Sequence, residues 1–173
     1  MAIAKTLLRA KTTIGISPEQ VLNAINVDIC KENDSLMFIT FFLGILNIET
    51  GFLRYCNAGH NPPLVHNSDE DFHYFHERKA QPPIGIIPDI AYIGNSVLLL
   101  PGDIFFLYTD GITEAINIDE VQFSEEKLQK ILKQNKRETV ANMINKIKAE
   151  VDLHSAGTLQ SDDITMLAIR YKT

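Results

Sequence analysis

An aspartate–glycine pair follows a run of apolar residues after one threonine, in the stretch LYTDGITEA at 107–115. A second acidic pair, Asp162–Asp163, stands directly before the apolar run ITMLAIRY at 164–171. Because each apolar run fits a strand, Asp110 and Asp162 stand at strand ends. If the two strands are antiparallel neighbours, the end of one meets the start of the other. We then expect both carboxylates at the same edge of one sheet.

Carboxylates that gather without a basic partner repel each other, and a divalent cation relieves that repulsion. Mg²⁺ and Mn²⁺ prefer oxygen ligands, so the pattern fits a site for one of these ions. Gly111 lacks a Cβ and would let the backbone or a bound water approach closely. The same residues also fit a plain turn at Asp110–Gly111 and a plain loop at Asp162–Asp163. Short acidic motifs alone do not decide between these interpretations.

Size and composition limit the class of protein. The chain has 173 residues, 45% of them hydrophobic, and we expect residues 1–173 to form a single domain with a sizeable core. A net charge of −6 argues against nucleic acid as a partner, because phosphate backbones are bound by clustered Lys and Arg. No apolar run reaches the roughly 18 residues of a membrane span, and no secretory leader is recognisable. Cys30 and Cys56 fit reduced thiols, which indicates a cytoplasmic location.

Helices, then strands, then helices and a final strand follow one another along the chain, an order that predicts an α+β fold. Helices are predicted over residues 1–11, 16–33, 123–134 and 137–154. Two of them carry start signals. Ser17 and Gln20 fit a capping box around Pro18, and Ser124 fits an N-cap. A single helical turn is expected at 113–117.

Strands are predicted over residues 37–48, 52–59, 62–67, 95–100, 104–108 and 164–171. The first two form a hairpin with Gly51 in its turn, and the apolar first strand is expected to be covered on both faces. Residues 68–80 are polar and fit a loop or an exposed edge. The strands 95–100 and 104–108 are expected to be joined by a tight turn at the sequence PGD.

Three segments together carry a family resemblance. They are MFITFFLGILNIETGFLRYCNAGHNPPLV at 37–65, LLLPGDIFFLYTDGITEA at 98–115 and SDDITMLAIR at 161–170. In this order and spacing they closely resemble the SpoIIE/RsbU-type serine/threonine phosphatases, bacterial members of the metal-dependent PPM (type 2C) phosphatases. The resemblance covers nearly the whole chain. It implies a PPM phosphatase-like α-β-β-α sandwich, with two mainly antiparallel sheets flanked by helices.

The resemblance also implies a chemistry. Asp110 matches the aspartate of the family's T-D-G motif and Asp162 the first aspartate of its D-D-I-T motif, and both are metal ligands there. Gly111 and Asp163 complete the metal-site residues implied, although eukaryotic relatives carry Asn at the position of Asp163. The family's reaction is hydrolysis of protein phosphoserine or phosphothreonine by a water that two Mn²⁺ or Mg²⁺ ions activate, and the ions clamp the phosphoryl oxygens.

The sequence departs from the family in one respect. The family's G-G-D-x-x-D and D-x-x-G-x-G motifs, which supply further acidic groups, have no counterpart here. We therefore expect an N-terminally truncated domain, the C-terminal portion of a longer sensor or regulator, with weak metal binding and weak or no activity. Missing strands would leave sheet edges unpaired, so a homodimer is possible.

Two further residues are weaker site candidates, and the function has an alternative. His60 in NAGHNPP fits either a general acid near the phosphate or a structural turn, and a lone histidine favours the turn. Arg54 could meet a phosphate or be an ordinary exposed strand residue. The expected partner is a phosphorylated regulatory protein of the anti-anti-sigma kind. The alternative function is a non-catalytic regulatory or protein-binding module on the same scaffold.

Overall fold

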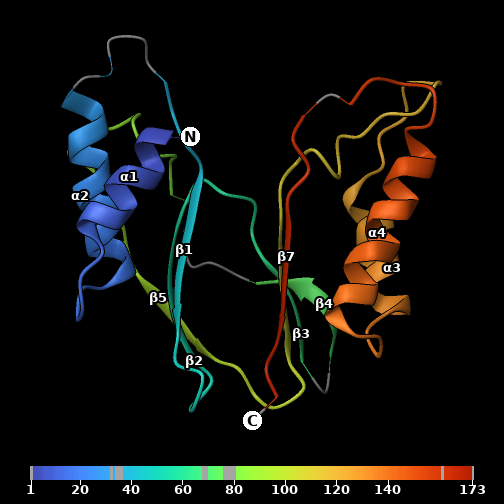
Figure 1. Cartoon of the computed structure of the whole chain (residues 1–173), viewed down its shortest axis with the longest axis horizontal. Coiled ribbons are helices and arrows are strands. Elements are labelled where there is room, and N and C mark those ends of the chain that lie inside the picture. Colours follow the sequence, from blue (N-terminus) through green and yellow to red (C-terminus); the bar gives the residue numbers. More distant parts are fainter. Residues whose placement is uncertain are drawn as a thin grey trace. The chain divides into compact units, whose positions relative to one another are not determined.

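The computed structural model describes residues 2–31, 33, 37–67, 70–75, 81–160 and 162–172. Within them the chain forms four helices and two antiparallel sheets of three and four strands (Figure 1). The predicted α+β class is confirmed. The chain divides into two compact units, the first made of Met1–His60, Glu77–Leu99 and Thr173 and the second of Asn61–His76 and Leu100–Lys172. That residues 1–173 act as a single domain stays a prediction. No helix in the described ranges has the length and apolar character needed to cross a membrane.

The first unit combines two helices with the three-stranded sheet, in the order β1-β2-β5. Its elements are α1 (Ala2–Lys11), α2 (Pro18–Lys31), β1 (Phe41–Leu46), β2 (Phe52–Ala58) and β5 (Asn95–Leu98). The predicted hairpin is confirmed, because β1 pairs antiparallel with β2 and Gly51 occupies the turn with φ 73°. The capping box forms in part, since the Ser17 N–H donates to the Gln20 Oε1 at 3.0 Å.

Helix α2 packs on the central strand of this sheet. Leu22 and Ile25 of α2 are fully buried in one cluster with Cys56 and Ala58 of β2. The expectation that the first strand is covered on both faces is wrong for its second half, where Ile45 is 44% exposed. The reason is position, because β1 is an edge strand of the sheet and the buried residues of α2 cluster with those of β2.

The second unit combines two helices with the four-stranded sheet, in the order β4-β3-β6-β7. Its elements are β3 (Leu64–Asn67), β4 (Glu70–Tyr74), β6 (Ile104–Tyr108), α3 (Glu125–Gln134), α4 (Val140–His154) and β7 (Met166–Arg170). Strand β4 is an edge strand, which agrees with one of the two interpretations of residues 68–80; residues 68–69 and 76–80 lie outside the described part. Ser124 caps α3 as predicted, accepting from the Lys127 N–H.

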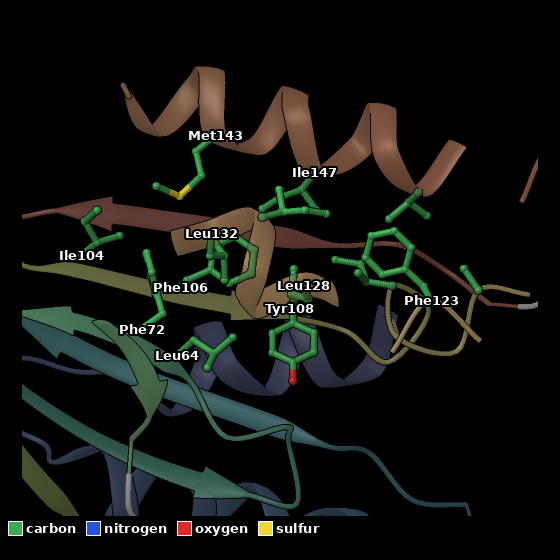
Figure 2. Packing of buried hydrophobic residues seen from close by; sticks show 14 residues of the cluster. Leu64, Phe72, Ile104, Phe106, Tyr108, Phe123, Leu128, Leu132, Met143 and Ile147 are labelled. Carbon is green, nitrogen blue, oxygen red and sulfur yellow. The ribbon is translucent and has the colours of Figure 1, made fainter. Parts of the chain in front are cut away.

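The core of the second unit lies between its sheet and its two helices. Alternate residues of β6, Ile104, Phe106 and Tyr108, point into one buried cluster, as a strand's period of two requires. Met143 and Ile147 of α4 reach toward them from the helix side (Figure 2). This packing fixes β6, the strand that leads to Asp110.

Two local expectations need correction. Strands β5 and β6 are joined by a turn as predicted, but they do not pair with each other: β5 pairs with β2, and β6 with β3 and β7. Residues 113–117 form no helical turn. The bond from the Glu114 N–H to the Asp110 carbonyl, at 2.8 Å, is not continued, because Ile116 forms an antiparallel bridge with Gln122.

Candidate functional site

The two acidic segments meet at one end of a strand pair in the second unit. Strands β6 and β7 are antiparallel, with Tyr108 opposite Met166 at the end where β6 finishes and β7 begins. Asp110 follows Tyr108 by two residues, and Asp163 precedes Met166 by three. The antiparallel neighbours assumed from the sequence are therefore present, and their acidic segments lie at the same sheet edge. We call Asp110, Gly111, Asp162 and Asp163 the acidic rim.

Within the acidic rim the two backbones are in close contact. A Cβ placed on Gly111 would lie 2.7 Å from the Asp163 carbonyl oxygen and 3.1 Å from that of Asp162. Real Cβ atoms do not approach backbone oxygens so closely, so only glycine fits here without displacing the 162–163 segment. The expectation that Gly111 permits a close approach is confirmed, and the approaching group is the backbone that carries the other two aspartates.

Thr109 lies next to the acidic rim and was given no role from the sequence. Its hydroxyl donates to the Asp163 carbonyl at 2.8 Å and accepts from the Thr165 N–H at 2.9 Å. Its own N–H donates to the Thr165 carbonyl at 3.1 Å. Thr109 thus continues the pairing of β6 and β7 beyond the strands. The sequence does place this hydroxyl residue between the end of a strand and Asp110, and that position could have indicated its role.

Further hydrogen bonds fix the backbone of each acidic segment. The Asp110 carbonyl accepts from the Glu114 N–H at 2.8 Å and from the Thr113 hydroxyl at 3.2 Å. The Gln160 side-chain amide donates to the Asp162 carbonyl at 2.7 Å. One carboxylate oxygen of Asp162 accepts from the Asp163 N–H at 2.6 Å. Each of these bonds engages a main-chain group, so the backbone of both acidic segments is fixed.

The donor chemistry of the acidic rim fits part of a site for a hard divalent cation. The side chains of Asp110, Asp162 and Asp163 are exposed and offer only oxygen donors. Among the described residues, no ion pair neutralises these three carboxylates. The described part of the chain also holds no group of three or more His, Cys, Asp or Glu side chains arranged to hold a metal ion. Their assignment as metal ligands stays a prediction.

The strand that leads to the acidic rim ends in a buried tyrosine. Tyr108 is 2% exposed, and its hydroxyl lies 3.3 Å from the hydroxyl of Tyr74 on β4. Burial, more than the hydrogen bond to Tyr74, raises the pKa of the Tyr108 phenol. The phenol is therefore neutral at ordinary pH, and the negative charge at this end of β6 comes from the aspartates.

The two weaker candidates, Arg54 and His60, belong to the first unit. The Arg54 guanidinium lies 3.8 Å from the Glu19 carboxylate of α2, which agrees with an ordinary structural role. The buried Asn57 side chain accepts from the His60 N–H at 2.8 Å and donates to the His60 carbonyl at 2.9 Å. His60 therefore lies in a turn in which the Asn57 side chain binds the His60 backbone, as the structural interpretation expects. A phosphate contact by either residue stays a prediction.

Comparison with known proteins identifies relatives of the whole chain. The family model for stage II sporulation protein E (SpoIIE) matches residues 1–172. Phosphoserine phosphatase RsbU of Bacillus subtilis (strain 168) is 27% identical over 172 residues, which cover 99% of this chain and 50% of RsbU. The curated relatives are longer proteins: the matched part spans 24%, 50% and 40% of their lengths.

Solved structures agree on the fold. The SiaA-PP2C domain of Pseudomonas aeruginosa overlays with a TM-score of 0.84 at 19% identity, covering 99% of this chain and 68% of that chain. The Mn-presoaked phosphatase domain of the cell fate determinant SpoIIE from Bacillus subtilis gives a TM-score of 0.66 at 19% identity, covering 98% and 73%. At these identities the likeness shows the fold, and it confirms the predicted PPM phosphatase-like class.

Proposed function

Because the chain belongs to the SpoIIE family, we propose that it hydrolyses phosphoserine or phosphothreonine on a protein, with Mn²⁺ or Mg²⁺ as cofactor. The observation that supports the proposal is the close approach of the backbone at Gly111 to the backbone of Asp162 and Asp163, at one end of the β6–β7 pair. Among the described residues no ion pair involves the carboxylates of Asp110, Asp162 and Asp163, and like charges carried by neighbouring segments repel each other unless a cation joins them. The phosphatase names of relatives such as RsbU support the same reaction class.

The proposal gives each residue of the acidic rim a role. Asp110 and Asp162 hold the cation through their carboxylates, and Asp163 adds a further oxygen donor beside them. Gly111 lets the two backbones meet closely enough for both carboxylates to serve one centre. When bound, divalent cations supply positive charge that stabilises the phosphoryl oxygens and favours attack by water. No side chain of the rim needs to act as a nucleophile.

The substrate and setting are also proposed. We propose a phosphorylated regulatory protein of the anti-anti-sigma kind as partner, a cytoplasmic location, and association into a homodimer. A protein substrate suits a rim whose three aspartates are exposed rather than enclosed. The net charge of −6 argues against a nucleic-acid partner.

The test is phosphate release from a phosphoserine peptide in the presence of Mn²⁺, using the natural protein that contains residues 1–173. We expect Asp110→Asn and Asp162→Asn each to lower kcat/KM by about 100-fold or more, because each removes a charge that holds the cation. Asp119→Asn is the matched control, since Asp119 is an exposed aspartate of the same unit outside the acidic rim.

Wild-type activity in Asp110→Asn and Asp162→Asn would remove the site assignment. If the wild-type protein binds its partner but releases no phosphate at any Mn²⁺ concentration, the alternative takes its place, a non-catalytic regulatory module on this scaffold. Separate assays of binding and of phosphate release therefore distinguish the two functions.

A further inference from the structure

We propose that Thr109 is a positioning residue that sets the affinity of the acidic rim for its divalent cation, an inference that rests on the proposed function. Thr109 directly precedes Asp110, yet its hydroxyl bonds the opposite acidic segment. A single side chain thus joins the two segments whose carboxylates are meant to share one ion.

The contacts of Thr109 connect parts of the chain that are far apart in sequence. The hydroxyl donates to the Asp163 carbonyl, 54 positions away, at 2.8 Å. It accepts from the Thr165 N–H, 56 positions away, at 2.9 Å. With its N–H bonded to the Thr165 carbonyl at 3.1 Å, Thr109 makes three bonds to residues 163–165. Strand pairing ends before this point, so the side chain supplies bonds that the strand ladder does not.

On the other side of Asp110, Gly111 lies close to the same segment. A Cβ at Gly111 would lie 2.7 Å from the Asp163 carbonyl oxygen, the same oxygen that accepts from Thr109. Asp110 therefore stands between two points at which its own segment touches the backbone of residue 163. The segment of Asp110 is thus bonded to the backbone of residue 163 through Thr109, and at Gly111 it lies too close to that backbone for a side chain to fit.

This arrangement has a physical consequence for ion binding. Neighbouring carboxylates repel each other, so without restraint the two segments would move apart in the absence of a cation. The bonds of Thr109 keep the two acidic segments close together before the cation binds. Less free energy is then lost in ordering the ligands, and the cation binds more tightly. Removing the hydroxyl should therefore weaken cation binding more than it changes the fold.

The experiment measures Mn²⁺ dissociation constants by titration calorimetry on the natural protein that contains these residues. Thr109→Val keeps the shape of the side chain and removes its hydrogen bonds, whereas Thr109→Ser keeps the hydroxyl. We expect about tenfold weaker Mn²⁺ binding in Thr109→Val, and binding within about twofold of wild type in Thr109→Ser. Thermal denaturation with EDTA present reports stability separately, and Thr109→Ala replaces the valine variant if that one does not fold.

Thr158→Val is the matched control. The Thr158 hydroxyl shares its one hydrogen between the carbonyls of Ile116 and Ser155, each at 2.8 Å, so its backbone bonds lie in the same unit and go to neither acidic segment. We expect Thr158→Val to lower the melting temperature and leave Mn²⁺ affinity unchanged. Equal weakening of Mn²⁺ binding in Thr158→Val and Thr109→Val would overturn the proposal, because the effect would then be a general loss of stability.

Two other outcomes separate this proposal from the function on which it rests. If Asp110→Asn abolishes Mn²⁺ binding while Thr109→Val binds like wild type, the metal site stands and Thr109 has no positioning role. If neither substitution changes Mn²⁺ binding, the assignment of the acidic rim itself fails. If Thr109→Ser binds Mn²⁺ as weakly as Thr109→Val, the hydroxyl group does not determine the affinity, and the proposal is contradicted.

Discussion

The two units of the molecule solve the same problem, holding irregular backbone in place, by different means. In the second unit the 162–165 segment is held by the hydroxyl of Thr109, next to a well-packed strand, and Gly111 leaves room for the close approach of that segment. In the first unit the segment 81–94, rich in proline and glycine, is held by buried amide side chains. Asn26 donates to the carbonyls of Ile87 and Pro88 and accepts from the Gly85 N–H.

Gln81 works in the same way within the first unit. Its amide donates to the carbonyls of Asn57 and Ile93 at 3.1 Å each, and its oxygen accepts from the Ile93 N–H. Buried backbone groups outside a strand ladder need such partners, because leaving them unpaired is costly. Both units have an apolar core. The comparison teaches that the irregular segment 81–94 of the first unit is bonded by amide side chains, whereas the 162–165 segment of the second unit is bonded by the Thr109 hydroxyl together with the Gln160 amide.

The largest effect is expected at the centre of the second unit. Phe106→Ala removes a fully buried ring of β6 and should lower the free energy of unfolding by about 3–5 kcal/mol. Leu167→Ala on neighbouring β7 is the control, since Leu167 is 50% exposed and should cost far less. Chemical denaturation measures both. Similar losses in the two variants would contradict a second unit that depends on its core.

The amide network of the first unit should give the next largest effect. Asn26→Ala leaves the Gly85 N–H and two carbonyls without their partner, and we expect a loss of about 2–3 kcal/mol in unfolding free energy. Asn23→Ala, which removes only the bond from the Tyr92 N–H, should cost about 1 kcal/mol. An Asn26 variant no less stable than the Asn23 variant would show that apolar packing dominates here too.

These two stability experiments also test the prediction of a single domain. If residues 1–173 unfold as one cooperative domain, Phe106→Ala and Asn26→Ala lower the same calorimetric transition, although they lie in different units. Two transitions, each lowered by only one of the substitutions, would show that the units unfold independently.

A third comparison concerns one glycine from each unit, Gly111 and Gly44, and the effect of replacing it on Mn²⁺ affinity. Gly111→Ala forces a Cβ to 2.7 Å from the Asp163 carbonyl oxygen, whereas in Gly44→Ala the nearest atoms belong to the side chains of Leu53, at 3.2 Å, and Phe42, at 3.4 Å. We expect about tenfold weaker Mn²⁺ binding for Gly111→Ala and no change for Gly44→Ala, because side chains move more easily than backbone. Calorimetric titration decides, and equal affinities would show that the close approach at Gly111 is not needed.

The smallest effect concerns surface charge and acid stability. Lys133, and next to it Lys136, lower the pKa of Asp71 from 3.8 to about 2 by hydrogen bonds from α3 and the residues after it to β4. The stability that this ionised carboxylate contributes is present above about pH 4 and is lost as the pH falls through about 2. Asp71→Asn should therefore flatten the fall of stability in that range.

Asp28 of the first unit provides the counterpart to Asp71. Its pKa is lowered by Lys11, which joins α1 to α2 at 2.7 Å, and Asp28→Asn should likewise reduce the acid sensitivity. Acid titration followed by circular dichroism measures both variants. An unchanged acid transition in both would mean that these exposed pairs contribute nothing measurable, as many surface ion pairs do.

Local signals in the sequence determined much of the fold. Ser17 and Ser124 mark helix starts, Gly51 marks the hairpin turn, and the unbroken apolar run IFFLY marks a buried strand. These features could be predicted because each depends only on residues that are close together in the sequence. The positions of Asp110 and Asp162 at strand ends followed from the same patterns, and the family resemblance gave them a chemistry.

Tertiary structure alone decided how those parts combine. The turn at residues 101–103 looks the same whether it closes a hairpin or connects strands of different sheets, and only the pairing of β5 with β2 and of β6 with β3 and β7 distinguishes them. The bonds of Thr109 to residues 163 and 165 and the contact of Gly111 with the 162–163 backbone likewise join positions more than 50 residues apart. No local pattern encodes such contacts, because they form only when the packed core has brought two strands together.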